Sequence, residues 1–209
     1  EFIRPFNLEK APLFRAQLLQ IKEDMYILLL DMHHIIADGI SLVHLIKELG
    51  QLYEGMELEL VKLHYKDFSV YQNNIIKQGA YQSYEKFWTE YLKQGIPLLD
   101  VPLDYKRGDT RTFAGDCIRF SIPDELTRGL YSIVRKNNIT LNSLLISLYS
   151  ILLCCYGNQE EVMIGSLVAG RNHPDLENVI GMFNNFVPIK INVRASSPLS
   201  DFLKSNNTN

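Results

Sequence analysis

Residues 25–53 read MYILLLDMHHIIADGISLVHLIKELGQLY, and this stretch decides the predicted fold. Met25–Met32 is a dense apolar run bounded by charges, short enough to be a buried strand. In Gly39–Tyr53 the large apolar residues recur every three to four positions, which is typical of an amphipathic helix. The loop between them carries two adjacent histidines and an Asp-Gly pair. Since a loop between two rigid elements can hold a reactive side chain in place, the sequence predicts a functional site here.

The segments on either side extend this pattern. Residues 12–21 alternate as a strand, and the charged residues 22–24 would form the turn of a hairpin with the next strand. Two more helices are predicted over residues 66–77 and 81–93. Residues 95–112 then combine Pro, Gly and several charged residues, which is typical of a linker.

The second half of the chain repeats the mixture of strands and helices. A strand is predicted over residues 116–122, a helix opening at Pro123-Asp124-Glu125, and a more buried helix over residues 140–156 with Thr140 as its N-cap. Residues 162–168 and 186–193 are predicted strands. The fold class is therefore α/β, with a break near residue 100. We expect residues 1–96 to belong to an N-terminal lobe, 97–112 to be the linker and 113–209 to belong to a C-terminal lobe.

Composition narrows the classes of function. The net charge of −3 and the scattered basic residues, of which Arg107 and Arg111 form the densest pair, argue against a nucleic-acid partner. No apolar run reaches the ~18 residues of a membrane span, and no signal peptide is visible. Cys117, Cys154 and Cys155 lie in apolar surroundings and are predicted to be small buried hydrophobes in a reducing compartment. The sequence thus predicts a soluble, cytoplasmic protein.

The histidine loop favours proton-transfer chemistry. Histidine has an unperturbed pKa of ~6.5 and therefore suits proton transfer near neutral pH. Neighbouring residues of a strand face opposite sides, so we expect His34 to face the chemistry and His33 to support it. A structural histidine beside an ordinary Asp-Gly turn is the plainer alternative. A metal site using both histidines and Asp38 is a third, although the other histidines (His44, His64 and His173) are isolated in the sequence.

The run HHIIADG at residues 33–39 resembles the His-His-x-x-x-Asp-Gly motif of condensation domains of nonribosomal peptide synthetases, relatives of chloramphenicol acetyltransferase. Other segments are similar to further motifs of that family, in the family's order: FNL at 6–8 with APLFRA at 11–16, YKDFSVY at 65–71, AGR at 169–171 and IGMFNNF at 180–186. The family-matched residues outside the histidine loop are Arg15, Tyr65, Asp67, Arg171, Gly181, Phe183 and Asn185. The resemblance covers nearly the whole chain.

The resemblance implies a two-lobed, chloramphenicol acetyltransferase-like α/β fold with mixed sheets and helices packed on them. The family's domain is roughly twice as long, so we expect the fold to be incomplete at both ends. The family's Arg-rich motif, whose arginine is thought to hold the motif's aspartate, would lie before Glu1. In the last motif the family's usual Val and Thr are Asn184 and Phe186, and only Asn185 of that trio matches.

The resemblance also implies an activity, which is peptide-bond formation in the biosynthesis of secondary metabolites such as antibiotics. An aminoacyl thioester would attack a donor thioester, and both would arrive on phosphopantetheine arms of upstream and downstream carrier domains beside an adenylation domain. The domain itself would bind no cofactor and no metal. His34, His33, Asp38 and Gly39 would form the catalytic set. Alternatives are a truncated, non-catalytic fragment that binds carriers, a CoA-dependent acyltransferase of the same superfamily, and an epimerisation or cyclisation relative.

Three physical expectations follow. His34 should lie in a loop at the end of the Met25–Met32 strand and face an open cleft, with His33 turned away. Asp38 should be structural and pair with a cation, for which Arg15 is a candidate if the family's usual arginine is absent. The isolated chain should be inactive and self-associate, because its apolar strands call for sheet neighbours that the sequence does not supply.

Overall fold

The computed structural model describes residues 2–106, 108, 110, 112, 114–194 and 196–207, and divides the chain into two compact units. Unit 1 consists of Glu1–Glu90 and Leu167–Phe186, and unit 2 of Tyr91–Ser166 and Val187–Asn209. Each unit therefore takes two separate stretches of chain. The lobe and linker bounds expected from the sequence stay a prediction, and Arg107 and Arg111 of the expected linker lie outside the described residues.

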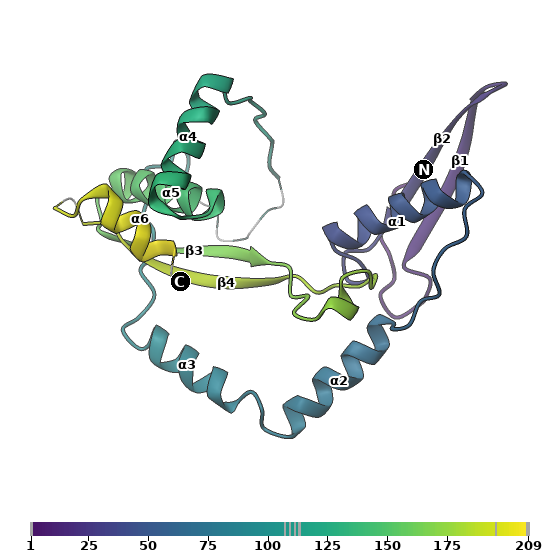
Figure 1. The fold of residues 1–209 in the computed structure, drawn as a ribbon, viewed down its shortest axis with the longest axis horizontal. Coiled ribbons are helices and arrows are strands. Elements are labelled where there is room, and N and C mark those ends of the chain that lie inside the picture. The colour runs from purple at the N-terminus through teal and green to yellow at the C-terminus, as the bar shows by residue number, and fades with distance from the viewer. Residues whose placement is uncertain are drawn as a thin grey trace. The chain divides into compact units, whose positions relative to one another are not determined.

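Unit 1 begins with the predicted hairpin. Strands β1 (Phe14–Lys22) and β2 (Met25–Met32) pair antiparallel, and the turn between them lies at Glu23 and Asp24 (Figure 1). A register shift near the turn leaves Ile21 without a partner residue on the other strand. Along the rest of the ladder, Arg15 lies opposite Asp31, so this pair shares one face of the hairpin.

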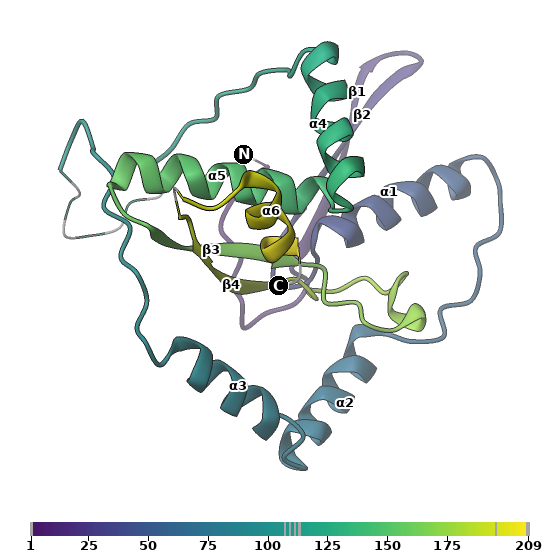
Figure 2. The same cartoon turned by 60° about the vertical axis from the view of Figure 1, so that its left-hand side comes forward.

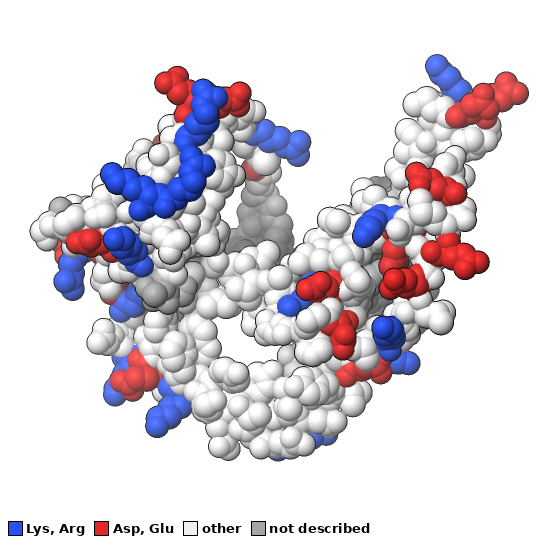
Figure 3. Space-filling model, in the orientation of Figure 1, with Lys and Arg blue, Asp and Glu red and all other residues white. Residues whose placement is uncertain are grey.

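The hairpin is apolar on both faces, and most of its large side chains are exposed. Leu18 and Leu28 lie opposite each other on one face and are 62% and 41% exposed, and Ile27 on the other face is 42% exposed. Lysine and acidic side chains gather at the hairpin tip (Figure 3). Two-stranded sheets of this kind need cover on a hydrophobic face to be stable. Self-association of the isolated chain stays a prediction.

Three helices follow the hairpin, close to the predicted bounds. They are α1 (Gly39–Tyr53), α2 (Tyr65–Lys77) and α3 (Gln82–Leu92). Local chemistry fixes two of their N-termini. The Asp38 carboxylate accepts from the Ser41 backbone N–H (2.9 Å) at the start of α1. The Asp67 carboxylate reaches back to accept from the His64 backbone N–H (2.8 Å) at the start of α2.

Unit 2 contains α4 (Asp124–Asn137), α5 (Leu141–Gly157), most of the strands β3 (Glu161–Val168) and β4 (Asn185–Asn192), and α6 (Leu199–Asn207). β3 and β4 pair with each other, and α4, α5 and α6 pack together beside them (Figure 2). Thr140 caps α5 as predicted, because its hydroxyl accepts from the Ser143 backbone N–H (3.0 Å).

The hydrophobic core lies in unit 2. It is formed by buried side chains from α5, both strands, α6 and the residue that precedes Thr140: Ile139, Leu144, Cys154, Val162, Ile191, Phe202 and Leu203. Burial raises the pKa of the Cys154 thiol, and the neighbouring Cys155 adds to the rise. The prediction of buried cysteines is confirmed for Cys154 alone, because Cys117 and Cys155 are exposed.

Two sequence predictions need correction. Residues 116–122 do not form a strand: the segment has no regular secondary structure and is exposed, with Ile118 at 90%, and among the described residues no strand pairs with it. Alternation of apolar residues predicts a half-buried strand, but a strand also needs a partner edge. Conversely, α6 was not predicted. It is short and mostly polar, and Phe202 and Leu203 hold it to the core.

No single helix within the described part of the chain is long and apolar enough to cross a membrane. Only α4 and α5 taken together, as a sharply bent pair, meet the criterion of length and composition.

Candidate active site

His34 lies two residues after the end of β2, in the turn that connects this strand with α1. Its side chain is exposed. The turn is closed by the Ile36 backbone N–H, which donates to the carbonyl of His33 (3.1 Å). The predicted position of His34 at the end of the strand is confirmed, while the cleft that it would face stays a prediction.

His33 is held on three sides. Its backbone N–H donates to the Leu13 carbonyl (3.0 Å), its Nδ1 accepts from the Ile35 N–H (3.1 Å), and its ring meets the Phe6 ring edge-on at 6.2 Å. The side chain is half-buried. His33 is therefore engaged in shaping the turn, as expected. No group of three His, Cys, Asp or Glu side chains among the described residues is placed to hold a metal ion.

Asp38 forms a buried ion pair with Arg171. The guanidinium makes two hydrogen bonds to the carboxylate, Nη1 to Oδ2 at 2.6 Å and Nη2 to Oδ1 at 3.0 Å, and both side chains are almost fully buried. The prediction that Asp38 is structural and pairs with a cation is confirmed. The candidate cation Arg15 was wrong, because Arg15 pairs with Asp31 on the hairpin (2.7 Å).

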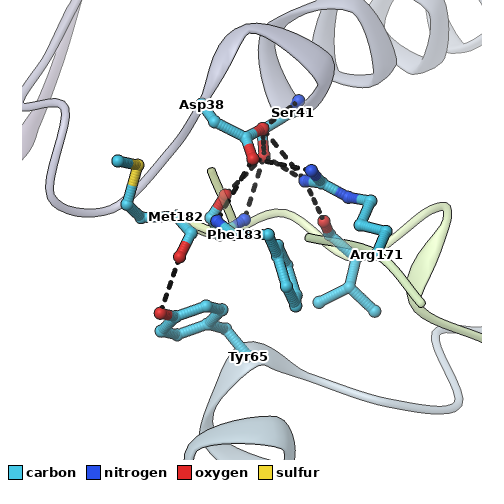
Figure 4. Close-up of polar contacts among 8 residues, drawn as sticks. Asp38, Ser41, Tyr65, Arg171, Met182 and Phe183 are labelled. Carbon is cyan, nitrogen blue, oxygen red and sulfur yellow. Dashed lines mark hydrogen bonds and ion pairs between the residues drawn. The ribbon is translucent and has the colours of Figure 1, made fainter. Parts of the chain in front are cut away.

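Ser41 adds further hydrogen bonds around this pair (Figure 4). Its hydroxyl oxygen is buried, lies 2.8 Å from Asp38 Oδ1 and accepts from Arg171 Nη2 and from the Gly181 N–H, both at 3.0 Å. The Gly181 carbonyl lies 2.9 Å away as a second acceptor for its single proton. Phe183 N–H donates to Asp38 Oδ2 at 3.2 Å. The N-cap of α1 is thereby joined to a segment about 140 residues later in the chain.

The charge of Asp38 is stabilised in the folded protein. Burial opposes ionisation, but hydrogen bonds from Arg171, from both Ser41 donors and from the Phe183 backbone outweigh it. They hold the pKa of Asp38 well below its usual value. The carboxylate therefore stays ionised throughout the physiological pH range. It stabilises the loop and does not take part in proton transfer.

The segment that carries Gly181 and Phe183 packs against the start of α2. The Tyr65 hydroxyl donates to the Met182 carbonyl (2.8 Å), and the Tyr65 ring lies so close to Gly181 that a Cβ there would fall 2.1 Å from Tyr65 Cδ2. The Phe183 ring is surrounded by the rings of Tyr65 (5.1 Å) and Phe68 (4.8 Å) and by the Arg171 guanidinium (4.3 Å). Gly181 is thus required for this packing.

Gly170, which precedes the pairing arginine, is required for a second reason. Its φ of 65° lies in the left-handed region, and a Cβ there would fall 2.0 Å from the Phe183 carbonyl oxygen. A side chain at this position would therefore force apart the two backbone segments that deliver Arg171 and Phe183 to Asp38.

The remaining predicted site residues do not join this cluster. Asp67 caps α2, and Asn185 is exposed at the first position of β4. Gly39 is the first residue of α1, has no positive φ, and would meet no described atom within 4 Å if it carried a Cβ. Gly39 therefore does not use the backbone freedom of glycine, and the open space where a side chain would stand is the feature that remains.

Sequence reasoning missed two residues. Ser41 stands three positions after Asp38, which is the spacing of an N-cap and the N–H that it accepts from, so the sequence did carry a signal for it. The pairing of Asp31 with Arg15 depends on the register shift at Ile21, because a regular ladder from the turn at Glu23 and Asp24 would place Arg15 opposite Met32. Ser41 contacts Asp38, whereas Asp31 contacts Arg15 on the hairpin.

Taken together, the geometry presents an exposed imidazole on a turn with fixed ends. β2 holds one end, and the buried Asp38–Arg171 pair holds the other. Such a group can accept or donate a proton, or orient a substrate by hydrogen bonding, without moving its supports.

The whole chain, residues 1–209, matches the model of the condensation-domain family. Among curated proteins, tyrocidine synthase 3 of Brevibacillus parabrevis is 40% identical over 98% of this chain, which covers 3% of that protein. Gramicidin S synthase 2 of Brevibacillus brevis is 42% identical over 91% of this chain and 4% of that protein. The chain therefore spans less than a tenth of the length of these relatives.

Solved structures share the fold at lower identity. A four-domain nonribosomal peptide synthetase bound to AMP and glycine superposes with a TM-score of 0.84 at 24% identity, over 98% of this chain and 16% of that one. The first condensation domain of the calcium-dependent antibiotic synthetase gives a TM-score of 0.76 at 20% identity, over 98% of this chain and 46% of that one. The X-domain from teicoplanin biosynthesis gives 0.84 at 18% identity, over 98% and 48%.

Proposed function

Since the chain belongs to the condensation-domain family, we propose that it carries the catalytic histidine of a unit that forms peptide bonds in nonribosomal peptide synthesis. The predicted chloramphenicol acetyltransferase-like α/β fold is confirmed by the structural likenesses. One observation carries the proposal. His34 is exposed on a turn whose far end is fixed by the buried Asp38–Arg171 pair, so the imidazole is both accessible and held.

The proposed reaction is acyl transfer between two thioesters. The amine nitrogen of the acceptor aminoacyl thioester attacks the carbonyl carbon of the donor thioester. A C–N bond forms, the C–S bond of the donor breaks, and the donor sulfur leaves as a thiol after it takes up a proton. The amine nitrogen loses one proton in the same sequence of steps, so atoms and charge balance.

His34 would act on that amine. A free α-amine has a pKa of ~7.7–8.0, so a sizeable fraction is already neutral near pH 7.5 and a strong base is unnecessary. The imidazole would orient the amine by a hydrogen bond and accept its proton as the new bond forms. General-base assistance of this kind contributes typically ~10²–10⁴-fold to the rate.

Gly39 would act through its backbone. Its N–H lies in the first turn of α1, where helix N–H groups have no partner within the helix, and a Cβ at Gly39 would meet no described atom within 4 Å. We propose that the donor carbonyl oxygen approaches this N–H as negative charge develops on it. A donor of this kind stabilises a tetrahedral intermediate.

The substrates would reach the site on phosphopantetheine arms of carrier domains upstream and downstream, next to an adenylation domain. The chain would hold no cofactor of its own. This assignment rests on the peptide synthases that the chain resembles, of which it spans only a small share.

The test is His34→Ala in the full-length parent synthetase, with condensation followed as dipeptide formation on the carriers and carrier loading measured separately. We expect condensation to fall by about 10²-fold or more while loading is unchanged. The matched control is His173→Ala, which removes another exposed histidine of unit 1 and should leave condensation unchanged.

The same assay separates the rival functions. Near-normal dipeptide yield from His34→Ala would favour a non-catalytic domain that only binds carriers. Acyl transfer from free acyl-CoA, without carriers, would favour a CoA-dependent acyltransferase. Gly39→Ala sharpens the result: it should lower the condensation rate without lowering thermal stability, since the added methyl meets no described atom.

A further inference from the structure

Arg15 of β1 makes more contacts than one ion pair requires. Its Nη1 donates to Asp31 Oδ2 (2.7 Å) and to the Arg4 carbonyl (2.6 Å), and its Nη2 donates to the Pro5 carbonyl (3.1 Å). The same guanidinium lies over the Phe6 ring at 3.7 Å from the ring centre. Arg15 therefore fastens three consecutive residues of the N-terminal segment to the hairpin.

Phe6 contacts both Arg15 and His33, so it connects the two residues. One side of the Phe6 ring faces Arg15, and the ring meets the His33 imidazole edge-on, with ring centres 6.2 Å apart. The two ring planes are nearly perpendicular, which is a preferred arrangement of aromatic rings. The orientation of the His33 ring therefore depends on the place where Arg15 holds Phe6.

His33 in turn shapes the backbone that carries His34. Its Nδ1 accepts from the Ile35 N–H at 3.1 Å, two residues on, which is the hydrogen bond that Asn and Asp side chains make in an Asx-turn. A nitrogen that accepts a hydrogen bond bears no proton, so the ring is bound in one orientation and one tautomer. His34 lies between the two bonded residues and takes its direction from them.

We propose that Arg15 is a positioning residue for His34 that acts through Phe6 and His33. The proposal rests on the proposed catalytic function of His34. Arg15 is suited to the role because the planar guanidinium binds a carboxylate and two carbonyls while its face stacks on a ring. A lysine at this position retains the charge that pairs with Asp31 but cannot make all of these contacts from one ammonium group.

Three variants of the full-length synthetase test this chain of contacts: Arg15→Lys, Phe6→Leu and the double variant. We expect Arg15→Lys to lower the kcat of condensation about tenfold with little change in KM, because small displacements of a catalytic group can cost up to ~10²-fold. Phe6→Leu should have a similar effect. The double variant should be no worse than either single variant, since both break the same path.

A readout independent of activity is hydrogen exchange at the Ile35 amide, whose partner is His33 Nδ1. Exchange there should be faster in Arg15→Lys and in Phe6→Leu. The matched control is Lys190→Met in unit 2, which breaks a comparable ion pair with Glu161 (3.0 Å) and should change neither the exchange nor the rate. Thermal unfolding establishes that each variant is folded.

The outcomes distinguish this proposal from the proposed function. Full activity and normal Ile35 exchange in Arg15→Lys, alongside an inactive His34→Ala, would overturn the positioning role alone. Multiplied losses in the double variant would also overturn it, because they would mean independent effects. If His34→Ala were fully active while Ile35 exchange still rose in Arg15→Lys, the proposed function would fail and the structural path would stand.

Discussion

The two units of this molecule are stabilised by different kinds of interior. Unit 2 has an ordinary apolar core, in which Leu144, Val162, Ile191 and Leu203 are each at most 1% exposed. In unit 1 the buried residues centre on an ion pair, with Asp38 and Ser41 as deeply buried as any apolar side chain of that unit.

This difference determines which side-chain substitutions each unit tolerates. An apolar core is non-directional and accepts substitutions that conserve volume. A buried polar cluster depends on each donor meeting its acceptor, and a single removed partner leaves the others unsatisfied. The stability of unit 1 should therefore depend mainly on keeping each hydrogen-bonding group. The stability of unit 2 should depend mainly on keeping the volume of its core side chains.

The largest effect is expected from Asp38→Ala, which leaves the Arg171 guanidinium buried without its partner. Loss of one member of a buried pair costs ~3–5 kcal/mol, so the free energy of unfolding of unit 1 should fall by about that amount. Chemical denaturation followed by hydrogen exchange on each unit measures it. The double variant Asp38→Asn, Arg171→Met should recover part of the loss, and in unit 2 Leu144→Ala should cost ~2–5 kcal/mol with no such rescue.

The stability of the two units should respond differently to low pH. The pKa of Asp38 is lowered by folding, so its contribution to stability is complete above about pH 5, where the unfolded-state carboxyl of pKa ~3.9 is also ionised. The contribution declines as the pH falls further. We expect hydrogen-exchange protection around Ser41 and Phe183 to weaken below about pH 4 before that of α5 does. Simultaneous loss in both units, unchanged in Asp38→Asn, would contradict this assignment.

Substituting one glycine in each unit by alanine should change the stability by smaller amounts and in opposite directions. Gly181→Ala would place a methyl carbon 2.1 Å from the Tyr65 ring, and overpacking of this kind costs typically ~1–3 kcal/mol. Gly129→Ala in α4 meets no described atom within 4 Å and should stabilise by ~0.5–1 kcal/mol, because alanine is the better helix former. Thermal unfolding of both variants measures these changes in stability. Equal shifts of the same sign would refute the packing argument.

The smallest effects are expected where both units use the same local device. Thr140→Ala removes the N-cap of α5, and Asp67→Ala removes the carboxylate that accepts from the His64 N–H at the start of α2. Each loss should cost about 1 kcal/mol, whichever unit the helix belongs to. Denaturant titration would measure both, and a cost above ~3 kcal/mol for either would mean that the residue does more than cap.

The sequence was a good guide wherever the determining interactions are short in range. The hairpin, α1 and the cap at Thr140 follow from patterns that span a few residues, and the position of His34 between a strand and a helix follows from them. The same reasoning failed at residues 116–122, since alternation there is not accompanied by a partner strand among the described residues. It also missed α6, whose place depends on the core and not on its own nine residues.

What the sequence determined by itself was the family, the histidine turn and the structural role expected of Asp38. Which cation pairs with Asp38 was decided only by the tertiary structure. Arg15 stands nearer in the sequence, but the hairpin register places it opposite Asp31, while Arg171 reaches Asp38 across 133 residues of chain. Periodicity and capping are set by neighbours within one or two turns, whereas a contact of this range is selected by the packing of Gly170, Gly181 and Phe183 around it, which no local pattern encodes.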